Sequence, residues 1–272
     1  MRIIAEALFR FYIWQHNTIK KIFPRLNRLI CKVAPFWYVY DFLYRLKTKD
    51  KFFYKEINGN KFTINLNDPR FSMRVIMYNY LLLKEYEPET TKIVKELVKE
   101  GNTVIDIGAS FGYFSWITSN LVGKAGKVYA IEPTEMGYNY LCLNRIANEA
   151  WNVKPYKMAA WDKDEPTFVP LNACGTNRIW AHGVRIDDFI KGKVDFIKCD
   201  VDGAEPQVLK GMIKTIENNP NLKMIFEYYP KYIKMAGGDP KEVMAIIDKY
   251  FNWEKIKGDY GEGYWNLLCK RK

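Results

Sequence analysis

The chain has 272 residues, of which 48% are hydrophobic and 27% are charged. This length and composition are typical of one large folded domain, with or without an appendage, and they exclude a disordered or collagen-like chain. Lys and Arg number 42 against 31 Asp and Glu, a formal net charge of +11. Residues 1–51 hold eleven Lys and Arg but only three acidic residues, so most of the excess charge is there. Electrostatic attraction to an anionic partner is therefore local to the N-terminus.

The cysteines and the apolar runs indicate where the protein resides. The five cysteines are odd in number and far apart, which favours reduced thiols over a disulfide framework or a zinc site. Glu6 and Arg10 interrupt the first apolar run, which argues against a signal peptide. No run approaches the roughly 18–20 apolar residues that a membrane-spanning helix needs. We therefore expect a cytoplasmic protein that does not span a membrane, although it could be peripheral on the inner face.

Residues 1–50 are predicted to form a basic, aromatic, helical extension. Apolar residues recur there at helical spacing, and Pro24 and Pro35 divide the segment into about three short helices. Basic residues interleaved with Trp, Tyr and Phe suit the headgroup zone of an anionic membrane. The same helices could instead pack on the main domain as a lid, with their lysines in solvent. Both interpretations stay open.

Residues 51–100 are predicted to lead into the core. Asn58-Gly59 is typical of a tight hairpin turn, and alternating apolar residues follow it. A helix is expected over Arg74–Lys84. A second helix begins at Pro88 and ends at Gly101.

From residue 101 to 272, short apolar strands alternate with helices. This pattern predicts an α/β fold with a mostly parallel, seven-stranded sheet covered by helices on both faces. The last two strands follow each other without a helix, which predicts a terminal antiparallel hairpin. The expected strands are 103–107, 127–131, 153–158, 194–198, 222–227, 253–257 and 265–269, and the expected helices are about 112–122, 135–149, 205–217 and 240–251.

The segment after the first of these strands has the composition of a ligand-binding loop. Gly108 and Gly112 would let a ligand approach the backbone, and Asp106 would place a carboxylate beside it. A carboxylate there repels phosphate and favours a cationic or hydroxyl-rich ligand. Glu132 ends the second strand, where an acid can accept from both hydroxyls of a ribose. Together these residues favour S-adenosylmethionine over a dinucleotide.

A second motif is an apolar strand that ends in several acids. Asp200, Asp202 and Glu205 follow the strand at 194–198, and Gly203 allows a tight entry into the next helix. The carboxyl ends of parallel strands are where open α/β sheets bind ligands. These acids are therefore expected to face a ligand.

These motifs resemble the FkbM family of S-adenosylmethionine-dependent methyltransferases. Ser110 stands where the family usually has Asn, and residues 1–50 are not covered by the resemblance. The resemblance implies a Rossmann-like class I fold and O-methylation, often of sugars or glycosylated products. It rests on residues 104–112, 128–133, 184–189, 194–211 and 225–227.

The resemblance also implies which residues bind the cofactor. Glu132 would bind the ribose, and Asp162 would reach the adenine amino group, although a turn acid or helix cap is an equal interpretation of Asp162. The methionine end would be bound by Asp106, Gly108, Ser110 and Gly112.

Methyl transfer requires the protein to align the acceptor and to remove one proton. Asp200 is the first candidate for the base or acceptor-orienting group, with Asp202 beside it. Glu205 could serve there or could simply be an acid favoured by the dipole of its helix. His182, in the variable loop 163–183, is a weaker candidate base, because the sequence favours a solvated loop histidine there. A divalent ion held by Asp200, Asp202 and Glu227 is conceivable, but no metal is predicted.

Three functions from different classes follow. The first is O-methylation of a hydroxyl, or of a carboxyl, on a glycan, a glycolipid or a lipid-linked acceptor. The second is a nucleic-acid methyltransferase whose basic N-terminus grips phosphate. It is disfavoured because the chain has no Asn/Asp-Pro-Pro-Tyr tetrad and no paired catalytic cysteines. The third is a non-catalytic protein that binds S-adenosylmethionine.

Overall fold

A computed structural model describes residues 52–57, 59–65, 86–170, 178–258 and 263–272. The chain divides into two compact units, and the larger one holds residues 58–62 and 85–272. The helices expected within residues 1–50 and over 74–84 lie outside the described residues. Within the described ranges no helix is long and apolar enough to cross a membrane.

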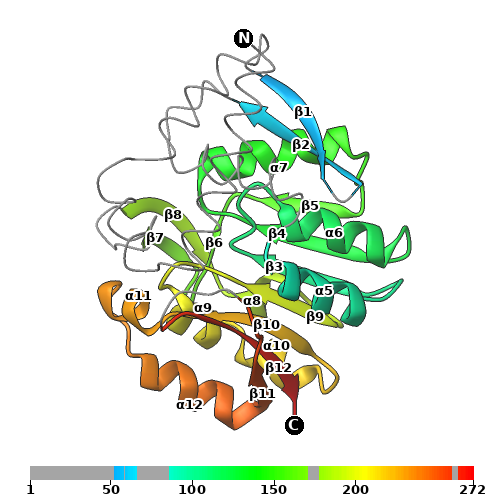
Figure 1. The fold of residues 1–272 in the computed structure, drawn as a ribbon. Coiled ribbons are helices and arrows are strands. Elements are labelled where there is room, and N and C mark those ends of the chain that lie inside the picture. The colour runs from blue at the N-terminus through cyan, green and yellow to red at the C-terminus, as the bar shows by residue number, and fades with distance from the viewer. Residues whose placement is uncertain (1–51, 58, 66–85, 171–177, 259–262) are drawn as a thin grey trace, which may run out of the picture. The chain divides into compact units, whose positions relative to one another are not determined.

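The larger unit contains a seven-stranded sheet with the strand order β11-β12-β10-β9-β3-β4-β5 (Figure 1). Strand β12 is antiparallel to both β10 and β11, whereas the pairs among β10, β9, β3, β4 and β5 are parallel. The predicted α/β class and the terminal antiparallel hairpin are confirmed. The strands are β3 (Thr103–Ile107), β4 (Lys127–Ile131), β5 (Val153–Tyr156), β9 (Phe196–Cys199), β10 (Lys223–Tyr228), β11 (Phe251–Lys255) and β12 (Trp265–Arg271).

The predicted hairpin near residue 59 is also present. Strands β1 (Phe52–Ile57) and β2 (Asn60–Asn65) form a two-stranded sheet. Gly59 between them has a φ of 74°, the conformation that a tight hairpin turn requires.

The predicted helices that begin near residues 88, 112, 135 and 240 are present, but the short helices Ile186–Phe189 and Pro230–Met235 were not predicted. Between residues 205 and 217, two short helices replace the single predicted one. Gly211 ends the first, and its carbonyl accepts from the amide of Asp187 at 3.0 Å. The Asp187 carboxylate then accepts from the amides of Lys214 and Thr215, which caps the second helix. The helices are α5 (Pro88–Leu97), α6 (Tyr113–Val122), α7 (Glu135–Ala147), α8 (Ile186–Phe189), α9 (Glu205–Lys210), α10 (Ile213–Asn218), α11 (Pro230–Met235) and α12 (Pro240–Tyr250).

A three-stranded sheet occupies much of the segment 163–183 that the sequence suggested to be a variable loop. It consists of β6 (Ala159–Ala160), β7 (Glu165–Pro170) and β8 (Arg178–Val184), in the order β6-β8-β7. The sequence gives a weak signal for β7, because Pro166 and Pro170 lie within a stretch that has no regular apolar alternation.

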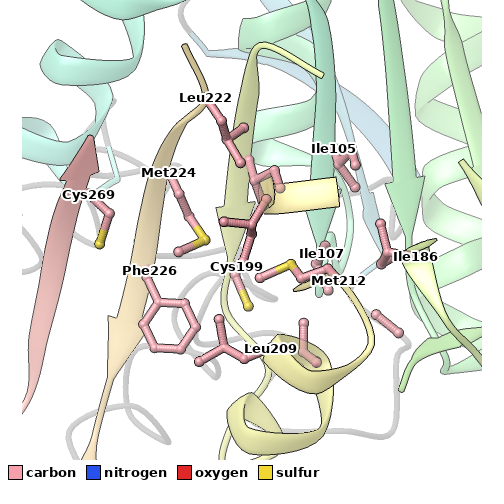
Figure 2. Packing of buried hydrophobic residues seen from close by; sticks show 14 of the residues in the cluster. Ile105, Ile107, Ile186, Cys199, Leu209, Met212, Leu222, Met224, Phe226 and Cys269 are labelled. Carbon is pink, nitrogen blue, oxygen red and sulfur yellow. The ribbon is translucent and has the colours of Figure 1, made fainter. Parts of the chain in front are cut away.

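The main core lies on one face of the seven-stranded sheet. Ile107, Cys199 and Phe226 come from adjacent strands and pack with Leu209 and Met212, as Figure 2 shows. Helices α9, α10 and α12 contribute further buried residues to this cluster. Cys199 is a free thiol, as are the other described cysteines, Cys142 and Cys269.

The opposite face carries polar side chains near the carboxyl ends of the same strands. Successive side chains of a strand alternate between faces, so Lys198 points away from the cluster that contains Cys199. Helix α6 lies on this second face, where the Nζ atom of Lys198 is 5.2 Å from the centre of the Phe114 ring. The candidate site is built on this face and on the loops that follow it.

Candidate functional site

The loop after β3 turns through three residues in the left-handed region. The φ angles are 79° at Gly108, 52° at Ser110 and 93° at Gly112. A Cβ at Gly108 would lie 1.8 Å from the backbone oxygen of Asp200, and one at Gly112 would lie 2.4 Å from the indole nitrogen of Trp116. Contacts within the protein therefore require both glycines. The expected approach of a ligand to this backbone stays a prediction.

Asp106 lies at the end of β3 and is buried. Its Oδ2 atom accepts a short hydrogen bond from the hydroxyl of Ser115 in α6. Burial raises the pKa of Asp106 to about 6, although the bond from Ser115 opposes the rise. The carboxyl group is thus held against α6, and its predicted contact with the methionine end of a ligand stays a prediction.

Glu132 follows β4 and is fixed at the edge of the sheet. Its Oε2 atom accepts from the amide of Ser110 and its Oε1 atom accepts from the amide of Thr134, both at 2.9 Å. A Cβ at Gly137 would lie 2.6 Å from the Cγ atom of Glu132, so the start of α7 packs directly on this side chain. The carboxylate therefore has one orientation, and it links the loop after β3 to the loop after β4.

Lys198, which is buried, and Asp200, which is partly exposed, form an ion pair at the end of β9. The Nζ atom of Lys198 lies 3.0 Å from the Oδ2 atom of Asp200. Burial by itself would lower the pKa of Lys198, but the charges of Asp200, Glu87 and Glu227 raise it above its ordinary value. Burial by itself would raise the pKa of Asp200. The positive charge of Lys198 outweighs this effect, so the pKa of Asp200 is lowered. Both groups are charged at neutral pH.

Glu227 lies at the end of β10, next to Asp200. Its side chain is buried, and burial together with the charge of Asp200 raises its pKa well above the ordinary value. The two carboxyl groups share a hydrogen bond, with Glu227 as the protonated donor and Asp200 as the ionised acceptor. The Oε2 atom of Glu227 is buried without a hydrogen-bond partner among the described residues.

Asp202 and Glu205 occupy the turn between β9 and α9 and differ in environment. Asp202 is exposed and has a φ of 52°. Partial desolvation, with the charges of Asp200 and Glu132, raises the pKa of Asp202 to about 6. Glu205 is 1% exposed, accepts from the amide of Gly203 at 3.2 Å, and has its pKa raised to about 8 by burial. Glu205 therefore supports the turn from beneath, whereas Asp202 is open to solvent.

The structure brings some of the predicted residues together and leaves others apart. Asp200 affects the pKa of both Asp106 and Asp202, which places these three acids near one another. His182 lies on β8 instead, where its Nε2 atom is 2.8 Å from Asp164 and its side chain is more than half exposed. Asp162 lies in the segment between β6 and β7. No described contact joins His182 or Asp162 to Asp200, and their proposed roles stay predictions.

Two residues of this site were missed by the sequence analysis. Glu87, just before α5, accepts at its Oε2 atom from the side-chain amide of Asn266 in β12, at 2.7 Å. Burial raises the pKa of Glu87, and the charge of Lys198 opposes that rise. The charge of Lys198 inside the apolar run 194–199 was the available signal, because a buried ammonium needs carboxylates around it. Nothing in the sequence indicated that Glu87 would be one of them.

Among the residues that the structure describes, no group of three His, Cys, Asp or Glu side chains is arranged to hold a metal ion.

This fold and site define a Rossmann-like class I methyltransferase. The Methyltransferase FkbM domain matches residues 106–252, more than half of the chain, and the chain belongs to this methyltransferase family. No match is found among curated proteins.

Solved structures of other methyltransferases resemble this chain. A candidate rRNA methylase from Clostridium thermocellum is 13% identical, and the alignment covers 68% of this chain and 94% of that one. The TM-score of 0.51 indicates a similar fold. The methyltransferase FkbM from Methylobacillus flagellatus KT is 17% identical, with 75% and 55% covered and a TM-score of 0.47. TYW2 from M. jannaschii, solved in complex with AdoMet, is 19% identical, with 83% and 89% covered and a TM-score of 0.46.

The cofactor of this class is S-adenosylmethionine, and the chemistry of the site fits it. The side chains at the strand ends are mainly carboxylates, which suit a sulfonium cation and ribose hydroxyls and repel phosphate. Lys198, the cation among them, is already paired with Asp200. Two amides fix the carboxylate of Glu132 at the end of β4, and its predicted contact with the ribose stays a prediction.

Proposed function

We propose that this chain is an S-adenosylmethionine-dependent O-methyltransferase acting on a sugar hydroxyl, or carboxyl, of a glycan, a glycolipid or a lipid-linked acceptor. One observation carries the proposal. Asp200 is an ionised carboxylate at the carboxyl end of a central strand, its side chain is 28% exposed, and its backbone abuts the turn at Gly108. A proton acceptor therefore lies beside the loop expected to bind the cofactor.

The chemistry needs little else from the protein. Bound S-adenosylmethionine supplies an activated methyl group. The hydroxyl oxygen that receives the methyl group must lose one proton, and the carboxylate of Asp200 accepts it. Lys198 keeps Asp200 ionised and fixes its Oδ2 atom, so that the other oxygen and the remaining lone pairs serve as proton acceptors.

The test is transfer of a radiolabelled methyl group from the cofactor to fractionated cell extract. Wild type is expected to label the glycan or lipid fraction, and Asp200→Asn is expected to lose that label by about 10²- to 10⁴-fold. Glu254→Gln, an exposed acid on β11, is the matched control and keeps full activity. Undiminished transfer by Asp200→Asn would refute the role of Asp200.

The same experiment addresses RNA as the alternative acceptor. The basic residues 1–51 would supply phosphate contacts, which weaken steeply with salt. Label in RNA that falls as salt rises, with none in glycan or lipid, would replace the sugar acceptor with a nucleic acid. Binding of the cofactor without transfer to any fraction would instead indicate a non-catalytic protein.

We also propose that residues 1–50 dock on the surface of an anionic membrane and bring the enzyme to a lipid-linked acceptor. The concentration of basic and aromatic residues in this segment supports the proposal. The full chain is expected to float with vesicles containing phosphatidylglycerol, and the reversal Lys20→Glu/Lys21→Glu to reduce flotation. The reversal Lys191→Glu/Lys193→Glu, at exposed positions of the larger unit, is the matched control. Equal flotation by both reversals would contradict membrane docking through residues 1–50.

A further inference from the structure

Three tyrosines form a cluster beyond the end of β10, which we call the tyrosine cluster: Tyr229, Tyr232 and Tyr264. The ring centres of Tyr229 and Tyr232 are 3.9 Å apart, and those of Tyr229 and Tyr264 are 5.4 Å apart. All three side chains are partly exposed. Tyr229 is the N-cap of α11, Tyr232 lies within α11 and Tyr264 directly precedes β12, so the cluster joins two separate segments.

The tyrosine cluster borders the candidate base. In the ladder between β10 and β12, Glu227 lies opposite Asn266 and Tyr228 lies opposite Trp265. Tyr229 and Tyr264 are the next positions of this register, directly beyond Glu227. After burial, the charges of Glu227 and Asp200 are the largest causes that raise the pKa of the Tyr264 hydroxyl, which is consistent with this proximity.

The other side of the cluster borders the turn at Asp202. A Cβ at Gly203 would lie 2.8 Å from the backbone oxygen of Tyr232, so α11 packs against this turn. The segment that carries Tyr229 and Tyr232 therefore adjoins two carboxyl-bearing segments, the end of β10 and the turn after β9. A sugar ring that stacks on these tyrosine side chains would have carboxyl groups near its edge.

The carboxyl groups around this position lack compensating positive charge. In the described part of the chain, Lys198 is the cation that acts on Asp200 and Glu227, and it is already paired. Two carboxyl oxygens, Oε2 of Glu205 and Oε2 of Glu227, are buried without a partner in the same described part. Glu205 and Glu227 are protonated at neutral pH and the charge of Asp200 is paired, so a further carboxylate or phosphate here would lose its hydration without meeting an unpaired cation among the described residues.

We propose that the acceptor sugar is neutral or carries an amino group, and that its ring stacks on the tyrosine cluster while its hydroxyls face Glu227 and Asp200. This inference rests on the proposed function and narrows the acceptor to a non-anionic sugar methylated on a hydroxyl. Aromatic faces carry partial negative charge, which attracts the C–H groups of a sugar ring and, more strongly, an ammonium group. Because the described residues around this position offer no unpaired cation, uronic acids and sugar phosphates would be desolvated without compensation and are excluded.

The first test identifies the methylated sugar itself. The radiolabelled glycan or lipid fraction is hydrolysed in acid, and the labelled monosaccharide is separated by anion exchange. The label is expected in a neutral or amino O-methyl sugar. Label in an O-methyl uronic acid or a phosphosugar would overturn the inference while leaving the methyltransferase intact, and so would release of the label as methanol by mild alkali before hydrolysis, which marks a methyl ester.

The second test removes one ring of the cluster. Tyr229→Ala is expected to raise KM for the labelled acceptor fraction about five- to tenfold, with little change in kcat. Tyr229→Phe keeps the ring and is expected to stay within about twofold of wild type. Tyr138→Ala, which removes a partly exposed tyrosine on α7, is the matched control.

Calorimetric binding of S-adenosylhomocysteine reports whether each variant is folded, and all three variants are expected to bind as wild type does. An unchanged KM in Tyr229→Ala, or an equal loss in Tyr229→Phe, would refute stacking. If the proposed function itself were wrong, wild type would label RNA or no fraction at all, which distinguishes that failure from either result with the Tyr229 variants.

Discussion

The two faces of the central sheet are built from the same strands and serve different purposes. On one face, Cys199 and Phe226 pack with helices α9 and α12 in the main apolar core. On the other, Lys198 and Glu227, their immediate neighbours in sequence, are equally buried but carry ionisable groups. Alternation along a strand places an apolar core and a charged cluster within one residue of each other.

Burial of the ionisable groups at the strand ends lowers the stability of the fold. Desolvation of buried ions typically offsets most of their mutual attraction, so hydrophobic replacements of buried ion pairs are often neutral or stabilising. Glu205 and Glu227 also leave a carboxyl oxygen each without a partner in the described ranges. The charged groups at the strand ends are therefore better explained by chemistry than by folding, although the same face also buries Val104, Phe196 and Ile225. The cluster that contains Cys199 and Phe226 is explained by folding alone. Four substitutions test this contrast.

Truncation on the apolar face is expected to have the largest effect on stability. Phe226→Ala removes a fully buried ring from the core and is expected to cost about 3–5 kcal/mol of unfolding free energy. Phe168→Ala, at an exposed position on β7, is expected to cost less than about 1 kcal/mol. Urea unfolding measures both values. Similar losses for the two variants would mean that this face is not the main core.

Substitution of Lys198 tests what the ion pair with Asp200 contributes to stability and to activity. Lys198→Met leaves the carboxylate of Asp200 buried without its partner, so it is expected to cost about 3 kcal/mol and to abolish methyl transfer. The double variant Lys198→Met/Asp200→Asn is expected to regain much of the stability but no activity. Lys154→Met, at an exposed position, controls for the loss of a lysine. A stable, active Lys198→Met protein would contradict the role given to the ion pair.

Glu205 makes stability depend on pH. Because burial raises its pKa from 4.5 to about 8, the folded state binds a proton that the unfolded state has lost between these values. Stability from this group is therefore highest below pH 4.5 and falls as the pH rises toward 8. Glu205→Gln stays neutral, so it is expected to match wild type at about pH 4 and to exceed it by about 1–3 kcal/mol at about pH 8.5.

Unfolding of both proteins in urea at the two pH values measures this difference. Glu254→Gln, on the exposed side of β11, is expected to show no such dependence. A constant difference between Glu205→Gln and wild type at both pH values would show that Glu205 is ionised in the folded state.

The sequence was sufficient for the parts of the fold that depend on local pattern. The strands 103–107 and 127–131 were predicted with their observed bounds, because apolar runs and a following glycine or proline define them. The break between α9 and α10 was not predictable, since it depends on a carboxylate from Asp187 in a separate segment. The sheet formed by β6, β7 and β8 was missed because pairing between strands, rather than apolar periodicity, stabilises it.

The candidate site likewise contains some residues that local pattern identified and others that only the tertiary fold brings together. Asp200 and Glu132 were identifiable because each follows a strand directly, at the edge where α/β proteins bind ligands. Glu87 and Asn266 were not, because they join Lys198 only through the tertiary fold, and both lie outside the residues matched by the family. The protonation of Glu227 likewise depends on its distance from Asp200, which no local pattern reveals.

Substitution of Ser110, in the loop that follows β3, is expected to have the smallest effect on stability. Its φ of 52° disfavours most residues, but Asn tolerates the left-handed region better than Ser, and a β-branched residue tolerates it worse. Ser110→Asn is expected to raise stability by a few tenths of a kcal/mol, and Ser110→Val to lower it by about 1–2 kcal/mol. Thermal unfolding measures both changes.

The same two variants decide what the side chain of Ser110 does, because the amide that donates to Glu132 is present in each. If only the backbone matters, S-adenosylhomocysteine binds both folded variants with wild-type affinity. If the hydroxyl contacts the methionine end, as the sequence predicts, Ser110→Val binds more weakly while Ser110→Asn, which keeps a polar group, loses less. A loss of affinity in Ser110→Asn that equals the loss in Ser110→Val would contradict both interpretations, since neither backbone strain nor the loss of a polar group is common to the two.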